Sequence, residues 1–165
     1  MTLQRHIPVE ASQAGKDHLW LQISSLPYFR ALLRAVEARF YENIDLPAPA
    51  LDLGCGDGHF ASLAFNRALE VGLDPWEKPL REAETRGVYQ QAVLTKASEI
   101  PYPDAYFTSA VSNSVLEHIP TLEPVLAELG RCYARERCSF FVCPINAFWV
   151  RSLLAVSSIT CACDF

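Results

Sequence analysis

Apolar and polar positions along the chain follow two different periods. Short, nearly continuous apolar runs predict five buried strands, at 49–53, 69–73, 88–94, 106–112 and 139–143. Stretches with apolar residues every three or four positions predict helices, at 26–43, 58–66, 76–86, 121–136 and 148–157. Strands that alternate with helices are typical of parallel βαβ units with right-handed crossovers. Residues 1–20 show no clear period and are expected to form an irregular arm.

The segment after the first strand is the most informative part of the chain. Residues 51–53 lead into Gly54-Cys55-Gly56-Asp57-Gly58, so three glycines occupy alternate positions between a strand and a helix. Glycine permits positive φ and a close approach of a ligand to the main chain, so this corner is typical of nucleotide binding. The second strand ends in Asp74, 20 residues after Gly54, where such folds offer a carboxylate to ribose hydroxyls.

The glycine spacing separates two classes of ligand. A dinucleotide fingerprint reads G-x-G-x-x-G, whereas this loop reads G-x-G-x-G and contains the acid Asp57. An acid is poorly suited to a pyrophosphate, but it is tolerable beside a ligand that carries an ammonium and a sulfonium. A nicotinamide-dependent oxidoreductase is therefore disfavoured, although it stays open as an alternative.

Three segments resemble the class I S-adenosylmethionine-dependent methyltransferases, most strongly the small-molecule branch with a bare catalytic domain. They are residues 51–58, 71–75 and 100–120, and the resemblance covers roughly residues 48–146. It implies a Rossmann-like, doubly wound α/β fold with a mostly parallel sheet. The full family sheet has the order 3-2-1-4-5-7-6 with an antiparallel strand seven. Since only about twenty residues follow the fifth strand, we expect the order 3-2-1-4-5 without the C-terminal antiparallel hairpin.

Three regions are expected on this basis. Residues 1–46 form an arm and a helix on the acceptor side, 47–146 the cofactor-binding core, and 147–165 the tail of an incomplete fold. A truncated chain or a short natural variant would leave the edge of strand five open, and an open edge favours self-association. An alternative function follows: a catalytically weak or inactive domain that binds cofactor or associates through that edge.

The resemblance implies S-adenosylmethionine as the cofactor. The residues expected to bind it are Asp52, Gly54, Cys55, Gly56, Gly58, Asp74, Pro75, Ala97, Ser98, Ser112 and Asn113. The glycines would line its methionine part, or form a tight turn with no ligand. Asp52 would reach its amino group or order the loop, and Asp74 would accept from both ribose hydroxyls or cap the next helix.

Two positions depart from the family pattern. Lys96 stands where the family usually places an acid that contacts the adenine amino group, and Thr108 stands where an acid usually leads strand four. An ammonium cannot accept a hydrogen bond from an amine. Either backbone groups near Ala97 and Ser98 accept that bond, or the affinity for the cofactor is reduced.

The expected reaction is methyl transfer to an oxygen, nitrogen or carbon nucleophile of a small molecule. The protein mainly has to align the nucleophile and exclude water, so a dedicated acid–base pair is optional. His118 is the candidate general base for a hydroxyl acceptor, and a structural histidine at a helix start is the alternative.

Composition narrows the remaining classes. The net charge is −5 and no lysine or arginine run occurs, which argues against nucleic acid as a partner; the arginines at 30, 34 and 39 are expected on a solvated helix face. No apolar stretch reaches the ~20 residues of a membrane span. The six cysteines are expected to be reduced in a cytoplasmic protein, and Cys161-x-Cys163 without a second pair argues against a metal site.

Overall fold

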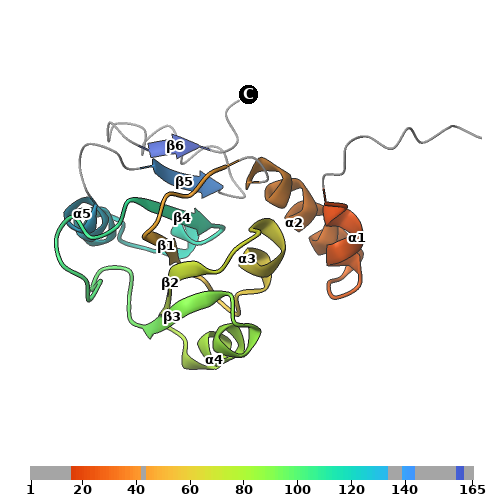
Figure 1. Cartoon of the computed structure of the whole chain (residues 1–165), viewed down its shortest axis with the longest axis horizontal. Helices are drawn as coiled ribbons and strands as arrows, with labels where there is room; N and C mark the ends of the chain where they lie inside the picture. The colour runs from red at the N-terminus through yellow and green to blue at the C-terminus, as the bar shows by residue number, and fades with distance from the viewer. Residues whose placement is uncertain (1–15, 42–43, 134–138, 144–158, 162–165) are drawn as a thin grey trace, which may run out of the picture.

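The computed structural model describes residues 16–41, 44–133, 139–143 and 159–161, and it shows a sheet between layers of helices (Figure 1). Its strands are β1 (Ala50–Leu53), β2 (Leu69–Asp74), β3 (Tyr89–Leu94), β4 (Ser109–Asn113), β5 (Ser139–Cys143) and β6 (Ile159–Cys161). They lie in the order β3-β2-β1-β4-β5-β6, and each neighbouring pair is parallel. The predicted Rossmann-like order 3-2-1-4-5 is confirmed.

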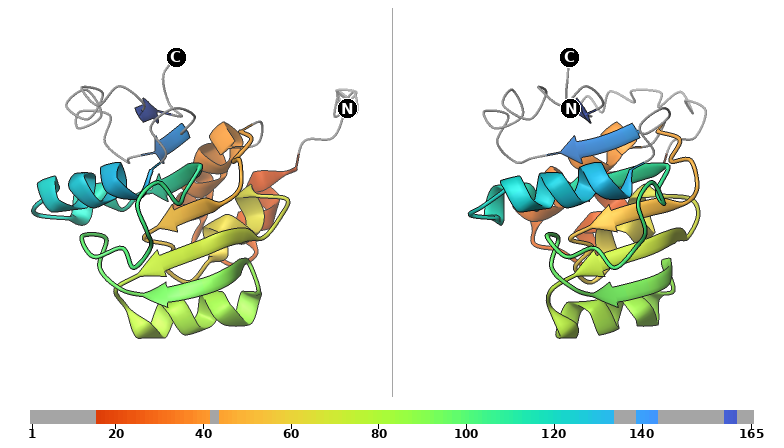
Figure 2. Two further views of the ribbon diagram at one scale, coloured as in Figure 1. Left: turned by 60° about the vertical axis from the view of Figure 1, so that its left-hand side comes forward. Right: turned by 90° about the vertical axis from the view of Figure 1, so that its left-hand side faces the viewer.

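The helices cover both faces of this sheet (Figure 2). They are α1 (His18–Ile23), α2 (Tyr28–Tyr41), α3 (His59–Ala64), α4 (Glu77–Arg86), α5 (Glu123–Cys132) and the short 3-10 helix η1 (Leu116–His118). In Figures 1 and 2, α5 lies on one side of the sheet, and α2 and α3 lie on the other, with α1 outside α2. The chain therefore folds in three layers, as the alternation of strands and helices predicts.

The expected open edge on strand five is not found over the described strands. Residues Phe140, Phe141 and Val142 of β5 pair in parallel with β6. The expectation of an open edge was wrong. It assumed that the residues after 146 form one helix and no further strand, whereas β6 pairs with β5. The expected helix at 148–157 lies outside the described residues.

Three element ends differ from the expectations for local reasons. An α-helix, α1, begins at His18 within the expected irregular arm of residues 1–20 and continues to Ile23; it is capped by the Asp17 carboxylate, which accepts from the Trp20 N–H at 3.0 Å. The fourth strand begins at Ser109, because Phe107 forms only an isolated bridge with Tyr133. Helix α5 accordingly ends at Cys132, where the chain turns extended.

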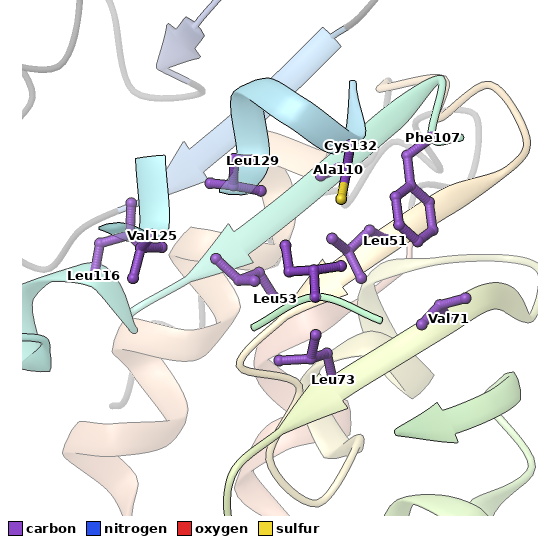
Figure 3. Close-up of a cluster of buried hydrophobic side chains, with 11 residues drawn as sticks. Leu51, Leu53, Val71, Leu73, Phe107, Ala110, Leu116, Val125, Leu129 and Cys132 are labelled. Carbon is purple, nitrogen blue, oxygen red and sulfur yellow. The ribbon is translucent and has the colours of Figure 1, made fainter. Parts of the chain in front are cut away.

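Alternate residues of the central strands enter two separate cores. Leu51 and Leu53 of β1 pack with α5 on one face (Figure 3), together with Val71, Leu73, Phe107, Ala110, Leu116, Val125, Leu129 and Cys132. Ala50 packs on the other face with Ala38 and Tyr41 of α2. Because side chains alternate along a strand, Asp52 shares the face of Ala50. Among the described residues, no helix is both long enough and apolar enough to span a bilayer.

Candidate functional site

The loop between β1 and α3 needs its glycines for conformation and for space. Gly54, Gly56 and Gly58 have φ values of 77°, 55° and 71°, a region that residues with a Cβ rarely adopt. A Cβ at Gly54 would collide with the Val115 side chain, whereas a Cβ at Gly56 would meet nothing within 4 Å. The N–H groups of Gly54 and Cys55 both donate to the Leu73 carbonyl, at 2.7 and 3.0 Å, and so hold the loop over the end of β2.

Asp74 ties the same loop to the end of β2. Its Oδ2 accepts from the Gly56 N–H and its Oδ1 from the Trp76 N–H, both at 2.9 Å. The carboxylate is 6% exposed and lines a cavity. Helix α4 is not capped by Asp74, because the capping position is Trp76 and α4 starts at Glu77. The acid is therefore oriented by main-chain donors at the carboxyl edge of the sheet.

Asp52 is held from two strands away. The Tyr89 hydroxyl, on β3, donates to Asp52 Oδ2 at 2.7 Å. The Tyr89 ring crosses β2 at Gly72, where a Cβ would collide with it. Burial raises the pKa of Asp52 to about 7, the bond from Tyr89 opposes this rise, and the nearby Asp74 charge adds to it.

Two adjoining cavities open at this edge of the sheet. The first, which we name the α2 cavity, has a volume of about 480 Å³ and lies between α2 and the glycine loop. The second, the Trp76 cavity, has a volume of about 560 Å³ and lies beyond the end of β2. Gly54, Ser114 and Val115 line both cavities. The strand order reverses between β1 and β4, and this is the crevice where open α/β sheets bind ligands.

The cavities collect most of the residues expected from sequence. The α2 cavity is lined by Asp52, Gly54, Cys55, Gly56 and Asn113. The Trp76 cavity is lined by Gly54, Asp74, Pro75, Ala97 and Ser98, and also by Trp76, Lys96 and His118.

Two expected residues line neither cavity. Gly58 lies at the start of α3, where a Cβ would collide with Val88 and crowd Ala83, so its role is packing. Ser112 is fully buried, and its hydroxyl donates to the Leu53 carbonyl at 3.0 Å. Cys55 lines the α2 cavity, but burial and the charges of Asp52 and Asp74 raise the pKa of its thiol, which keeps it protonated.

Helix α2 contributes polar side chains that the sequence analysis missed. Glu37 is 8% exposed, and its Oε2 accepts from Arg34 at 2.7 Å and from the Asn113 amide at 2.9 Å. Its Oε1 accepts from the Ser114 hydroxyl at 3.2 Å. These bonds clamp α2 to the carboxyl end of β4, beside the α2 cavity.

The expectation that the α2 arginines lie on a solvated face is confirmed for Arg30 and Arg39, which are exposed, and wrong for Arg34, which is half-buried. Arg30 and Arg34 line the α2 cavity, whereas Arg39 is exposed and lines neither cavity. Their spacing of four residues was the available signal, since it places both on one side of a helix. That signal could not say which side faces the glycine loop.

A family model described as a methyltransferase domain matches residues 51–136, which is more than half of the chain. A trans-aconitate 2-methyltransferase of Methylobacterium nodulans is 35% identical over 106 residues, covering 61% of this chain and 40% of that protein. The chain spans about two-fifths of the length of the curated relatives it matches.

Solved structures share the fold. A SAM-dependent methyltransferase from Thermotoga maritima has a TM-score of 0.54 at 21% identity, covering 71% of this chain and 56% of that chain. A geranyl diphosphate methyltransferase in complex with GPP and sinefungin has a TM-score of 0.51 at 18% identity, covering 62% and 42%. Together with the extent of the family match, the glycine loop and the sheet order show that this chain belongs to the methyltransferase domain family.

Proposed function

We propose that the protein binds S-adenosylmethionine across the two cavities and transfers its methyl group to an oxygen, nitrogen or carbon nucleophile of a small molecule. The observation that carries the proposal is the loop at Gly54 and Gly56, anchored to Asp74, at the point where the sheet order reverses. Membership of the methyltransferase family supports it. So does the fold shared with a methyltransferase whose structure holds sinefungin, an analogue of the cofactor.

The residues present fit such a cofactor. Asp74 offers carboxylate oxygens for ribose hydroxyls, and Pro75, Trp76 and Ala97 offer apolar surface for adenine in the Trp76 cavity. In the α2 cavity, Asp52 and the Asn113 amide oxygen offer acceptors for an ammonium group. The Asn113 Oδ1 is buried and accepts no hydrogen bond within the described part of the chain, so it has capacity for a ligand.

The proposed catalysis is mainly alignment. When bound, the sulfonium supplies an electrophilic methyl group. The protein then has to hold the nucleophile in line with this methyl group and to exclude water. Helix α2 forms one wall of the α2 cavity, where it would shield the reacting groups from water. His118 is exposed and lines the Trp76 cavity, on the proposed adenosine side, so the proposal does not depend on it as a base.

Isothermal titration with S-adenosylhomocysteine tests the proposal. The wild-type protein should bind it, and Asp74→Asn should weaken binding by about tenfold, because a charged acceptor is lost. Asp45→Asn, at an exposed acid that lines neither cavity, is the matched control and should bind like wild type. No heat and no thermal shift at millimolar ligand would overturn the proposal. Binding of NAD instead would favour an oxidoreductase.

Transfer is measured separately from binding. A radiolabelled methyl group should pass from S-adenosylmethionine to an acceptor, and trans-aconitate is one acceptor to include because a relative carries it in its name. The second candidate function, a domain that binds cofactor weakly without transfer, is favoured by Lys96 in the wall of the Trp76 cavity. Normal affinity for S-adenosylhomocysteine together with transfer would exclude that candidate.

A further inference from the structure

The wall of the α2 cavity opposite the glycine loop is cationic. Arg30 and Arg34 lie one helical turn apart on α2, and both line this cavity. Figure 1 shows α2 on the same side of the sheet as α3, the helix that follows the glycine loop. The two arginines and the glycine loop therefore line the same cavity, although α2 and the loop are distant in sequence.

These guanidinium groups keep donors available. Among the residues that the structure describes, Arg30 forms no hydrogen bond and no ion pair. Arg34 is held through one nitrogen, Nη1, which donates to Glu37 at 2.7 Å and to the Ser114 hydroxyl at 3.2 Å. Its Nε and Nη2 make no hydrogen bond within the same described ranges. A guanidinium presents five donors in a planar fork that matches a carboxylate.

The two acids that line the cavity, Asp52 and Asp57, do not neutralise the charges of Arg30 and Arg34. Asp57 pairs with Arg86 at 3.2 Å, also in the cavity wall. Asp52 accepts from Tyr89, and its pKa of about 7 leaves it only partly charged near neutral pH. Arg30 therefore has no acid partner among the described residues, whereas Arg34 pairs with Glu37, which is not part of the cavity lining, and keeps its Nε and Nη2 donors available.

His59 is another side chain in the lining of the α2 cavity. Its Nε2 lies 2.9 Å from the Ser25 hydroxyl, also in the cavity wall. Burial lowers the pKa of His59, and the charges of Arg86, Arg30 and Arg34 lower it further, while Asp57 opposes them. The imidazole is therefore neutral near pH 7, and it adds a polar group to the cavity without adding charge.

We propose that Arg30 and Arg34 bind a carboxylate in the α2 cavity, and that this group belongs to the methyl acceptor, which is then an organic acid. This inference rests on the proposed function. The methionine end of the cofactor also carries a carboxylate, so the same chemistry has two sources. We assign the bound carboxylate to the methyl acceptor because Arg30 lies at the exposed rim of the cavity. The groups that would accept hydrogen bonds from the cofactor's ammonium, on Asp52 and Asn113, lie deeper.

The test measures binding of two carboxylates, succinate and tricarballylate, to protein saturated with S-adenosylhomocysteine. Wild-type protein should bind at least one of them, with an affinity that falls as salt is raised. Arg30→Gln and Arg34→Gln should each weaken this binding by about tenfold, because each removes a charge-assisted hydrogen-bond donor. Arg39→Gln, on the same helix but outside both cavities, is the matched control and should leave binding unchanged.

Other arms of the experiment separate the two sources of carboxylate. If Arg30→Gln and Arg34→Gln weaken S-adenosylhomocysteine but not its decarboxylated analogue, the arginines serve the cofactor and the acceptor assignment is overturned. It is also overturned if neither acid binds wild-type protein at 10 mM, or if Arg39→Gln has the same effect as Arg30→Gln. Failure of wild-type protein to bind S-adenosylhomocysteine would instead remove the proposed function itself. Arg30→Gln is the leading variant, since Arg30 has no described partner whose loss would unfold the protein.

Discussion

The two cavities are built from different kinds of structure. The Trp76 cavity is formed mainly by segments that follow strand ends and by backbone held at fixed positions, at Asp74, Pro75 and Ala97. The α2 cavity depends in addition on side chains of a helix distant in sequence, clamped by Glu37 to the end of β4. The sheet therefore fixes the first cavity, whereas the second depends on the docking of α2. Substitutions should affect the two parts differently.

The largest effect is expected at the loop shared by both cavities. Gly54→Ala should lower the free energy of unfolding by about 3 kcal/mol, because positive φ is unfavourable for alanine and its Cβ collides with Val115. Binding of S-adenosylhomocysteine should be lost. Urea denaturation and titration measure the two effects.

Gly56→Ala is the matched control for this loop. It has a similar φ of 55° but no atom within 4 Å of the added Cβ, so it should cost only about 1 kcal/mol. Val115→Ala should restore part of the stability of Gly54→Ala. Equal costs for the two alanine variants would contradict the claim that Val115 packs closely on Gly54.

The next largest effect should separate the α2 cavity from the Trp76 cavity. Glu37→Ala removes the acceptor of Arg34, Asn113 and Ser114, and it should cost about 2 kcal/mol, since buried donors lose their partner. Hydrogen exchange should increase in α2 more than in β2. Glu82→Ala, at an exposed acid of α4, should change stability by less than about 0.5 kcal/mol. Equal protection of α2 in wild type and Glu37→Ala would argue against the clamp.

A smaller effect on the free energy of unfolding is expected from Asp52, the acid beneath the glycine loop, and the size of this effect depends on pH. The pKa of Asp52 is about 7 in the folded protein against an ordinary value of 3.8, so the folded state holds the proton more tightly. The contribution of Asp52 to the free energy of unfolding therefore falls as pH rises from about 4 to about 7. Tyr89→Phe removes a bond that opposes the pKa rise, so it should cost about 1 kcal/mol at pH 8 and less at pH 5.

Unfolding at a series of pH values checks this expectation. Asp52→Asn carries no titrating group, so it should lose the part of the slope between pH 4 and 7 that wild type owes to Asp52. Tyr89→Phe made on the Asp52→Asn background should show a cost that no longer depends on pH. A slope that persists unchanged in Asp52→Asn would show that other groups cause it.

The smallest effect is expected at Lys96, the residue of the Trp76 cavity that departs from the family pattern. Lys96→Asp replaces an ammonium with a hydrogen-bond acceptor in the cavity wall, so affinity for S-adenosylhomocysteine should rise by about threefold to tenfold. Lys78→Asp, on α4 and outside both cavities, controls for the change in net charge. Unchanged affinity in Lys96→Asp would indicate that backbone groups already accept the adenine amine.

The difference between the cavities also explains what the sequence could predict. Glycines at 54 and 56 and an acid 20 residues after Gly54 are local signals, because parallel strands bring their carboxyl ends to one edge. The strand order was expected from the resemblance of residues 51–58, 71–75 and 100–120 to the methyltransferase family, and the structure confirms it. The polar face of α2 carries no such signal. The contacts of Arg30, Arg34 and Glu37 with the cavity can be recognised only when the position of α2 against the sheet is known. Strand β6 was missed because three residues are too short for a periodic pattern.

The passage of the Tyr89 ring over Gly72 has a consequence for observing this protein at work. It links a phenol on the outermost strand to a carboxylate on the first strand, beneath the glycine loop. The ultraviolet absorption and fluorescence of that phenol should change when Asp52 gains or loses its proton, and Tyr89→Phe should remove the change. The protein thus contains its own optical probe of the protonation of Asp52, with no label attached.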